Sequence, residues 1–221
     1  MRFTTVLASF LIAGCSSMPT DNNTTPPDFL LPTAGPLTTD SAGKQGDAAK
    51  RGVVRVVCLA TGLGGTGFLH NSGAVLTAAH VVAGCQPKDL LLLPPSGGSF
   101  GVLKLVADSE KDLALLHPVA VLPGSPLTIS SIAAPVIGAQ VTTWGFPGGY
   151  DGLSPLLSVG YLSGVQEFKA PSGTTIHRWV VNAAFNGGNS GGPLLSVEDG
   201  RVIGVVSSKL APLPPSLAQA R

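Results

Sequence analysis

Short apolar runs, each ended within a few residues by glycine, proline or serine, follow one another along the chain from about residue 53 onward. The sequence contains 29 glycines and 19 prolines, which is typical of a chain with many turns. Long stretches with the apolar spacing of an amphipathic helix are missing. We therefore predict an all-β protein. The candidate strands of its first half are 53–59, 66–70, 74–77, 89–93, 102–107 and 113–116.

The second half of the chain yields five further candidate strands, after a connection at residues 123–138 that is rich in proline and serine. The domain at residues 52–221 is long enough for one compact unit or for two small antiparallel β-barrels that share one interface, the first over about residues 52–122 and the second over about 139–210. The second barrel lacks a sixth candidate, so either its final strand is short and irregular or the sequence is truncated. Its candidate strands are 140–144, 156–166, 175–181, 192–197 and 202–207.

A glycine-rich segment in the second half places one serine among small residues, reading Gly187-Gly188-Asn189-Ser190-Gly191-Gly192-Pro193-Leu194. Upstream, His80 ends the run Leu76-Thr77-Ala78-Ala79-His80, and Asp112 begins the run Asp112-Leu113-Ala114-Leu115-Leu116. A serine hydroxyl becomes a good nucleophile when an imidazole takes its proton and a carboxylate orients that imidazole. The three residues therefore form a candidate catalytic triad.

The glycines around Ser190 have a separate function. They allow a tight, partly left-handed turn, in which the amides of Gly188 and Ser190 can point at one developing oxyanion. Taken singly, each motif also has a simpler interpretation, because Gly-Asn-Ser-Gly is typical of a hairpin turn and a lone His80 or Asp112 of a structural or solvated residue. All three in this order favour catalysis. The remaining histidines, His70, His117 and His177, match no motif.

These residues resemble the trypsin-like (chymotrypsin-fold) serine endopeptidases, in particular the bacterial HtrA-like and related short trypsin-like peptidases. The resemblance covers about residues 52–208 and includes Gly65-Thr66-Gly67-Phe68 ahead of the His80 motif. It implies that His80 and Asp112 come from the first barrel and Ser190 from the second, with the active site between them. It also implies cleavage of peptide bonds through an acyl-enzyme. A peptide-binding pseudoprotease that keeps the groove without turnover, and a structural envelope lipoprotein, are the alternatives.

The resemblance further places Ala184 and Phe185 at the base and wall of the pocket for the side chain before the scissile bond, with Ser207 beside it. Nothing acidic stands there, so a buried Lys or Arg side chain would lack a partner. We expect a preference for small aliphatic residues.

The chain has three cysteines, Cys15, Cys58 and Cys85. Cys15 lies in a candidate lipid-attachment site described below, which leaves Cys58 and Cys85 as a pair. In the resembling family a disulfide often joins the strand before the histidine to the loop after it, which implies a Cys58–Cys85 bond. Two reduced thiols or a redox pair are the alternatives, and the spacing differs from the Cys-x-x-Cys of redox sites.

The first residues are typical of a targeting segment. Residues 1–14 read as a signal peptide, and Ile12-Ala13-Gly14-Cys15 resembles a bacterial lipoprotein cleavage box. We expect lipid on Cys15 and a flexible tether at residues 15–51. Because Ser16 is not the aspartate that retains such proteins at the inner membrane, the expected location is the periplasmic face of the outer membrane. A plain secretory signal with a chance cysteine is the alternative.

The charge balance and motifs exclude other classes. A net charge of +1 without a basic run argues against a nucleic-acid partner. No cluster has metal-ligand spacing and no glycine-rich loop leads from a strand into a helix, so we expect no metal and no cofactor. The expected partners are protein or peptide substrates and the membrane, and the sequence does not predict an oligomeric state.

Overall fold

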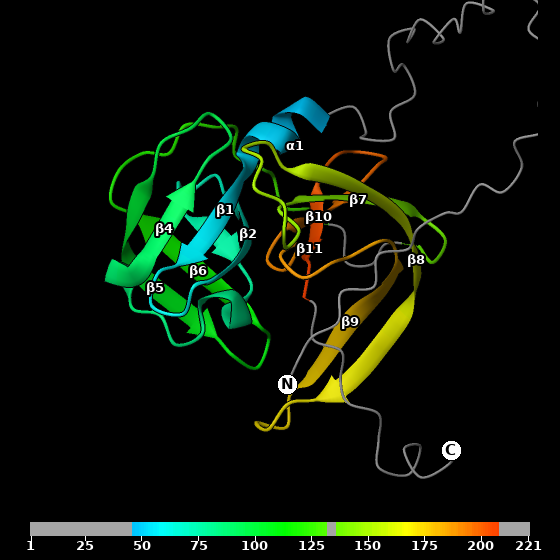
Figure 1. Ribbon diagram of the computed structural model, residues 1–221. Coiled ribbons are helices and arrows are strands. Elements are labelled where there is room, and N and C mark those ends of the chain that lie inside the picture. Colours follow the sequence, from blue (N-terminus) through cyan, green and yellow to red (C-terminus); the bar gives the residue numbers. More distant parts are fainter. Residues whose placement is uncertain (1–45, 132–135, 208–221) are drawn as a thin grey trace, which may run out of the picture. The chain divides into compact units, whose positions relative to one another are not determined.

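The computed structural model describes residues 46–131 and 136–207 (Figure 1). The predicted signal peptide, Cys15 and residues 15–45 of the tether lie outside the described residues. So do residues 208–221, on which the question of a final strand depends. None of the helices in the described part is long and apolar enough to span a membrane.

Six antiparallel strands of the first half close into a barrel in the order β1-β2-β3-β6-β5-β4. In β1, β4 and β6, buried residues alternate with more exposed ones, as expected when one face of each strand lines a core. Val54, Val56, Leu92 and Leu116 are among the side chains that fill this core. The strands are β1 (Val53–Cys58), β2 (Leu63–Leu69), β3 (Val75–Thr77), β4 (Leu90–Leu93), β5 (Phe100–Asp108) and β6 (Leu113–Pro118).

The second half forms a curled sheet of five antiparallel strands in the order β11-β10-β7-β8-β9. The prediction of an all-β, two-barrel fold is confirmed, with a closed first barrel and a half-barrel as the second. Each of the candidate strands corresponds to an observed one. The strands of the second sheet are β7 (Gln140–Gly145), β8 (Leu156–Lys169), β9 (Thr175–Asn182), β10 (Pro193–Ser196) and β11 (Val202–Val205).

An apolar cluster joins the two sheets. Val53 and Phe68 of the barrel pack with Phe146, Leu195 and Val202 of the second half, and all five side chains are buried. This shared core fixes the position of β2 relative to β10. It thereby fixes how the candidate catalytic residues carried by the two sheets are placed relative to one another.

One prediction about the tether is wrong. Residues 46–51, assigned to a flexible segment, belong to a short helix, α1 (Gly46–Gly52). Ala49 on this helix is 1% exposed and packs into the shared apolar cluster, so tertiary burial orders a segment whose composition suggested a linker.

Candidate active site

His80 is held on a single turn of 3₁₀ helix, Ala79–Val82, that directly follows β3. Its ring Nδ1 lies 2.7 Å from Asp112 Oδ2, and its backbone amide donates to Asp112 Oδ1 at 2.9 Å. A carboxylate facing Nδ1 keeps the ring proton on that nitrogen, which leaves Nε2 as the nitrogen able to accept a proton. The arrangement suits a general base.

Asp112 lies in the turn between β5 and β6 with a φ of +56°, in the left-handed region that aspartate tolerates better than most residues. This conformation lets it bind the His80 segment through both its side chain and its backbone, because its backbone carbonyl also accepts the Ala79 amide at 3.1 Å. The turn is closed by Asp108, whose Oδ1 accepts the amides of Glu110 and Lys111. The hydrogen bonds from the Lys111 amide and ammonium, partly opposed by desolvation, hold the pKa of Asp108 below its usual value.

The Asp112 carboxylate is 2% exposed and is surrounded by donors. Burial raises the pKa of Asp112, but the hydrogen bonds from Ser207, from the His80 amide and from the His80 ring together outweigh it, so the pKa lies below its ordinary value. Ser207 Oγ donates to Asp112 Oδ2 at 2.6 Å. Asp112 therefore stays ionised at neutral pH, as a partner of an imidazolium must.

Ser190 lies in the turn between β9 and β10 and is 4% exposed. Its carbonyl accepts the Thr66 amide of β2 at 2.8 Å, and β2 is paired with the strand that leads to His80. On its other side, Gly191 donates to the carbonyl of Val206, the neighbour of Ser207, at 2.7 Å. Backbone hydrogen bonds thus join the Ser190 turn to β2, the neighbour of the strand that leads to His80, and to the residue before Ser207, whose hydroxyl is bonded to Asp112.

The glycines beside Ser190 are required by geometry. Gly191 has a φ of +85°, and a Cβ there would collide with Thr66 O and Thr77 Oγ1. Gly188 has a φ of +96°, and the Asn189 amide donates to the Asn186 carbonyl at 3.1 Å. This combination is typical of a type II turn over residues 186–189, named here the oxyanion turn. Among the described residues, no acceptor is hydrogen-bonded to the Gly188 amide, which fits a donor reserved for substrate.

The residues predicted to form the specificity pocket are only partly brought together. Phe185 and Ser207 border a hollow of about 570 Å³ beside β9 and β11, and Ala184 does not border it. Phe185 packs against the cluster of Val141, Leu162 and Leu194 inside the second sheet. The Ser207 hydroxyl donates to Asp112 Oδ2, a contact that the sequence does not predict.

The structure joins Cys58 and Cys85 in a disulfide. The bond connects the end of β1 to the segment just after the 3₁₀ turn of His80. Both cysteines are buried in the core of the first barrel.

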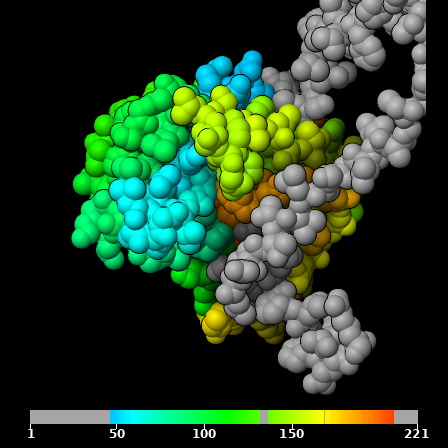
Figure 2. All heavy atoms as spheres, viewed as in Figure 1, coloured from blue at the N-terminus to red at the C-terminus, as the bar shows by residue number. Residues whose placement is uncertain are grey.

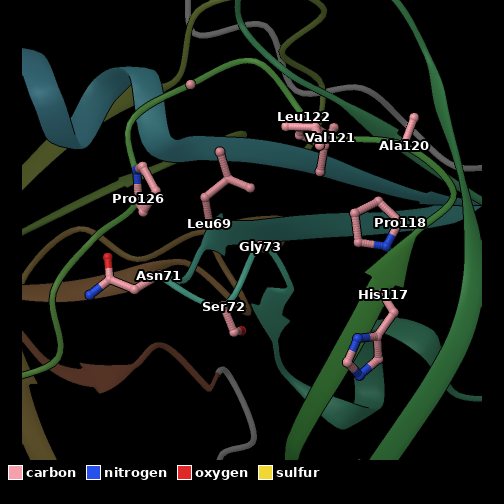
Figure 3. Close-up of a pocket in the computed structure, with 11 residues that line it drawn as sticks. Leu69, Asn71, Ser72, Gly73, His117, Pro118, Ala120, Val121, Leu122 and Pro126 are labelled. Atoms are coloured by element: carbon pink, nitrogen blue, oxygen red, sulfur yellow. The ribbon is translucent and has the colours of Figure 1, made fainter.

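The other histidines lie elsewhere. His70 Nδ1 is 2.9 Å from Ser72 Oγ, and His177 Nδ1 is 3.1 Å from Glu167 Oε1 at an exposed site. His117 borders a hollow of about 400 Å³ beside the β2–β3 turn, which contains none of the triad residues (Figure 3). Within the described ranges, no three His, Cys, Asp or Glu side chains are grouped so that they could hold a metal ion.

A chymotrypsin-like pair of β-barrels, with a His-Asp pair on one and a serine in a glycine turn on the other, defines the class of trypsin-like peptidases. The chain belongs to the Trypsin-like peptidase domain family, which matches residues 65–205.

Similar proteins carry protease names. The chain is 33% identical over 147 residues to Serine protease Rv3671c of Mycobacterium tuberculosis, covering 65% of this chain and 36% of that protein. It is 36% identical over 149 residues to Putative serine protease HhoA of Synechocystis, covering 64% of this chain and 36% of that protein. The chain thus spans about a third of the length of these curated relatives.

Solved structures agree with the fold. The crystal structure of the active form of Rv3671c protease matches with a TM-score of 0.63 and 26% identity, over 86% of this chain and 83% of that one. The inactive form gives a TM-score of 0.61 and 28% identity, over 72% of this chain and 79% of that one.

Proposed function

We propose that this chain is a serine endopeptidase that hydrolyses peptide bonds through an acyl-enzyme at Ser190. The observation that supports this most is the buried Asp112 carboxylate with His80 Nδ1 at 2.7 Å, in a structure where the Ser190 turn is bonded to Thr66 and Val206. The relatives named as serine proteases support the same reaction class.

In the proposed reaction, Ser190 Oγ attacks the carbonyl carbon of the scissile bond while His80 Nε2 takes the hydroxyl proton. The carbonyl oxygen becomes an oxyanion, which the amides of Gly188 and Ser190 stabilise. The C–N bond then breaks as His80 gives its proton to the leaving amine. Water then attacks the acyl carbon of the acyl-enzyme while His80 Nε2 takes a proton from the water. The ester bond to Ser190 breaks, the carboxylic acid product leaves, and His80 returns the proton to Ser190 Oγ. The Asp112 carboxylate stabilises the His80 imidazolium in both halves of the reaction.

The test is hydrolysis of a denatured protein by the wild type, Ser190→Ala and His80→Ala. Either substitution should lower turnover by about five to six orders of magnitude with little loss of thermal stability, because triad members act as a unit. Equal turnover in all three proteins would overturn the assignment. A wild type that binds peptides without cleaving them would instead favour the peptide-binding pseudoprotease.

We also propose that the peptidase is attached to the bacterial envelope through lipid on Cys15, after removal of residues 1–14. The support is the Ile12-Ala13-Gly14-Cys15 box behind a short apolar run. In the native bacterial host, Cys15→Ser should move the protein from the membrane to the soluble fraction, since the attached acyl chains supply the anchoring. Unchanged partitioning would favour a plain secretory signal.

For specificity, we propose cleavage after small aliphatic residues. The residues that support this, Ala184 and Phe185, are uncharged. Mass-spectrometric profiling of a denatured protein digest should show Ala and Val before the cleaved bonds, shifting toward larger residues in Phe185→Ala. Cleavage mainly after Arg, Lys or Glu would contradict the proposal.

A further inference from the structure

The amide, carbonyl and hydroxyl of Thr66 are all hydrogen-bonded, and the hydroxyl contacts the oxyanion turn from the first barrel. Its amide donates to Ser190 O at 2.8 Å, and its carbonyl accepts from Thr77 Oγ1 at 2.7 Å. Its hydroxyl donates to Gly188 O at 2.7 Å and accepts from the Phe146 amide at 3.0 Å. The residue is 0% exposed. One buried hydroxyl therefore links β2 to two loops of the second half of the chain.

The oxyanion turn has two accessible forms, which differ in the direction of one amide. In a type II turn the third residue has a positive φ, and in a type I turn its φ is about −90°. Conversion between them rotates the central peptide, which here joins Gly187 to Gly188 and carries the Gly188 N–H. Because glycine adopts both φ values readily, the sequence of the turn does not itself select the form in which that N–H serves the oxyanion.

Two hydrogen bonds hold the observed form. The hydroxyl of Thr66 binds the carbonyl of Gly188, on the C-terminal side of the central peptide. The Gly148 amide binds the carbonyl of Gly187, within the central peptide, at 2.5 Å. Gly148 follows Phe146 by two residues, and the Phe146 amide is bonded to the same Thr66 hydroxyl.

The segment that supplies Gly148 is fixed at its far end as well. Arg55 of β1 donates to the carbonyls of Tyr150 and Gly152 at 2.8 and 2.9 Å, and its guanidinium lies 4.8 Å from the centre of the Phe146 ring. In Figure 2 this yellow-green segment lies against the cyan atoms of β1. The first barrel thus holds residues 146–152, and Thr66 connects them to the turn.

We propose that Thr66 is a positioning residue that keeps the oxyanion turn in the form in which the Gly188 amide can bind the developing oxyanion. The inference rests on the proposed peptidase function and concerns the same site. The single oxygen of the Thr66 hydroxyl donates to Gly188 O and accepts from Phe146 N at once. Valine has the shape of threonine but neither capacity, and it would leave both backbone groups buried without a partner.

The test compares Thr66→Val with Thr142→Val. Thr142 is 1% exposed, and its hydroxyl has no hydrogen-bond partner among the described residues, so it controls for the substitution itself. Thr66→Val should lower kcat for a peptide ester about 100-fold, the loss typical of one oxyanion donor. KM should stay near the wild-type value, and Thr142→Val should leave kcat unchanged.

A second pair guards against misfolding of the valine variant. Thr66→Ala and Thr66→Ser both lose the methyl group and differ only in the hydroxyl. Thr66→Ser should restore most of the activity that Thr66→Ala loses. Equal kcat in this pair would overturn the proposal.

Peptide binding separates positioning from general damage. In a Ser190→Ala background, adding Thr66→Val should leave the dissociation constant of a substrate peptide unchanged. Weaker binding that matches the loss of kcat would overturn the proposal. If the wild type itself fails to hydrolyse the ester, the proposed function fails. If the wild type is active and Thr66→Val is as fast, only this inference fails.

Discussion

Replacing Asp112 by asparagine is expected to lower kcat about ten-thousand-fold while the fold is kept. The carboxylate accepts from the His80 amide at 2.9 Å, from His80 Nδ1 at 2.7 Å and from Ser207 Oγ at 2.6 Å. If the oxygen of the new asparagine side chain faces the His80 backbone amide, the NH₂ group of that side chain donates to His80 Nδ1. The ring proton of His80 is then forced onto Nε2. The base nitrogen is then blocked. If the amide is reversed, two buried N–H donors face each other.

The loss in rate corresponds to about 5.5 kcal/mol of transition-state stabilisation. Unfolding should also become easier by about 2–4 kcal/mol, because bonds to a charged acceptor are replaced by weaker or unmade ones. The assay is kcat and KM on one peptide ester, together with urea unfolding. Asp108→Asn, the same substitution on the exposed side of the turn, serves as the control and should keep the wild-type kcat.

The stability that the Asp112 charge contributes should depend on pH in a definite direction. The folded pKa of Asp112 is lowered, so the stability that its charge contributes is present above the unfolded value of about 3.9. It is lost as the pH falls through the folded pKa. The stability difference between wild type and Asp112→Asn should therefore shrink as the pH falls below about 4. A stability difference that grows as the pH falls below about 4, or a kcat within tenfold of the wild type, would refute the reasoning.

Three further outcomes are expected. Gly145→Ala places a Cβ 2.7 Å from Asn189 Oδ1 and 3.1 Å from Thr66 Oγ1, so kcat should fall about tenfold, whereas Gly164→Ala, with nothing within 4 Å, should be silent in the same assay. Reduction of the Cys58–Cys85 bond, with a sequence separation of 27, should lower the unfolding free energy by about 3 kcal/mol in urea melts, and the reductant should not change a Cys58→Ala/Cys85→Ala protein. Chains that begin at Ser16 and at Ala42 should have equal kcat. Activation by cleavage of the tether would need an ion pair between the new N-terminus and the residue before Ser190, and the side-chain amide of Asn189 is neutral; activity in only the shorter chain would contradict this. A chain that begins at Gly52 loses Ala49 from the shared core and should melt earlier.

Much of the fold could be predicted because its strands follow a local rule. Runs such as Val53–Cys58 are rich in β-branched residues and end at turns, so single-sequence patterns find them. Helix α1 escaped the prediction because its stability comes from the burial of Ala49 against distant residues, which composition does not record.

The site shows the same division. His80, Asp112 and Ser190 stand in motifs whose chemistry is readable from the residue types and their order. The contacts of Ser207 with Asp112 and of Thr66 with Gly188 span 95 and 122 residues in the sequence. No local sequence motif around Ser207 or Thr66 predicts these contacts. Thr66 lies in the Gly65-Thr66-Gly67-Phe68 stretch, which marked the family but gave no hint of a role for the hydroxyl.

The nucleophile is tested most directly by a serine-reactive fluorophosphonate followed by mass spectrometry of the intact and digested protein. We predict one adduct per chain, located on Ser190, absent in Ser190→Ala and formed far more slowly in His80→Ala. An unlabelled wild type, or an adduct that persists in Ser190→Ala, would contradict the assignment of Ser190 as the nucleophile activated by His80 and Asp112.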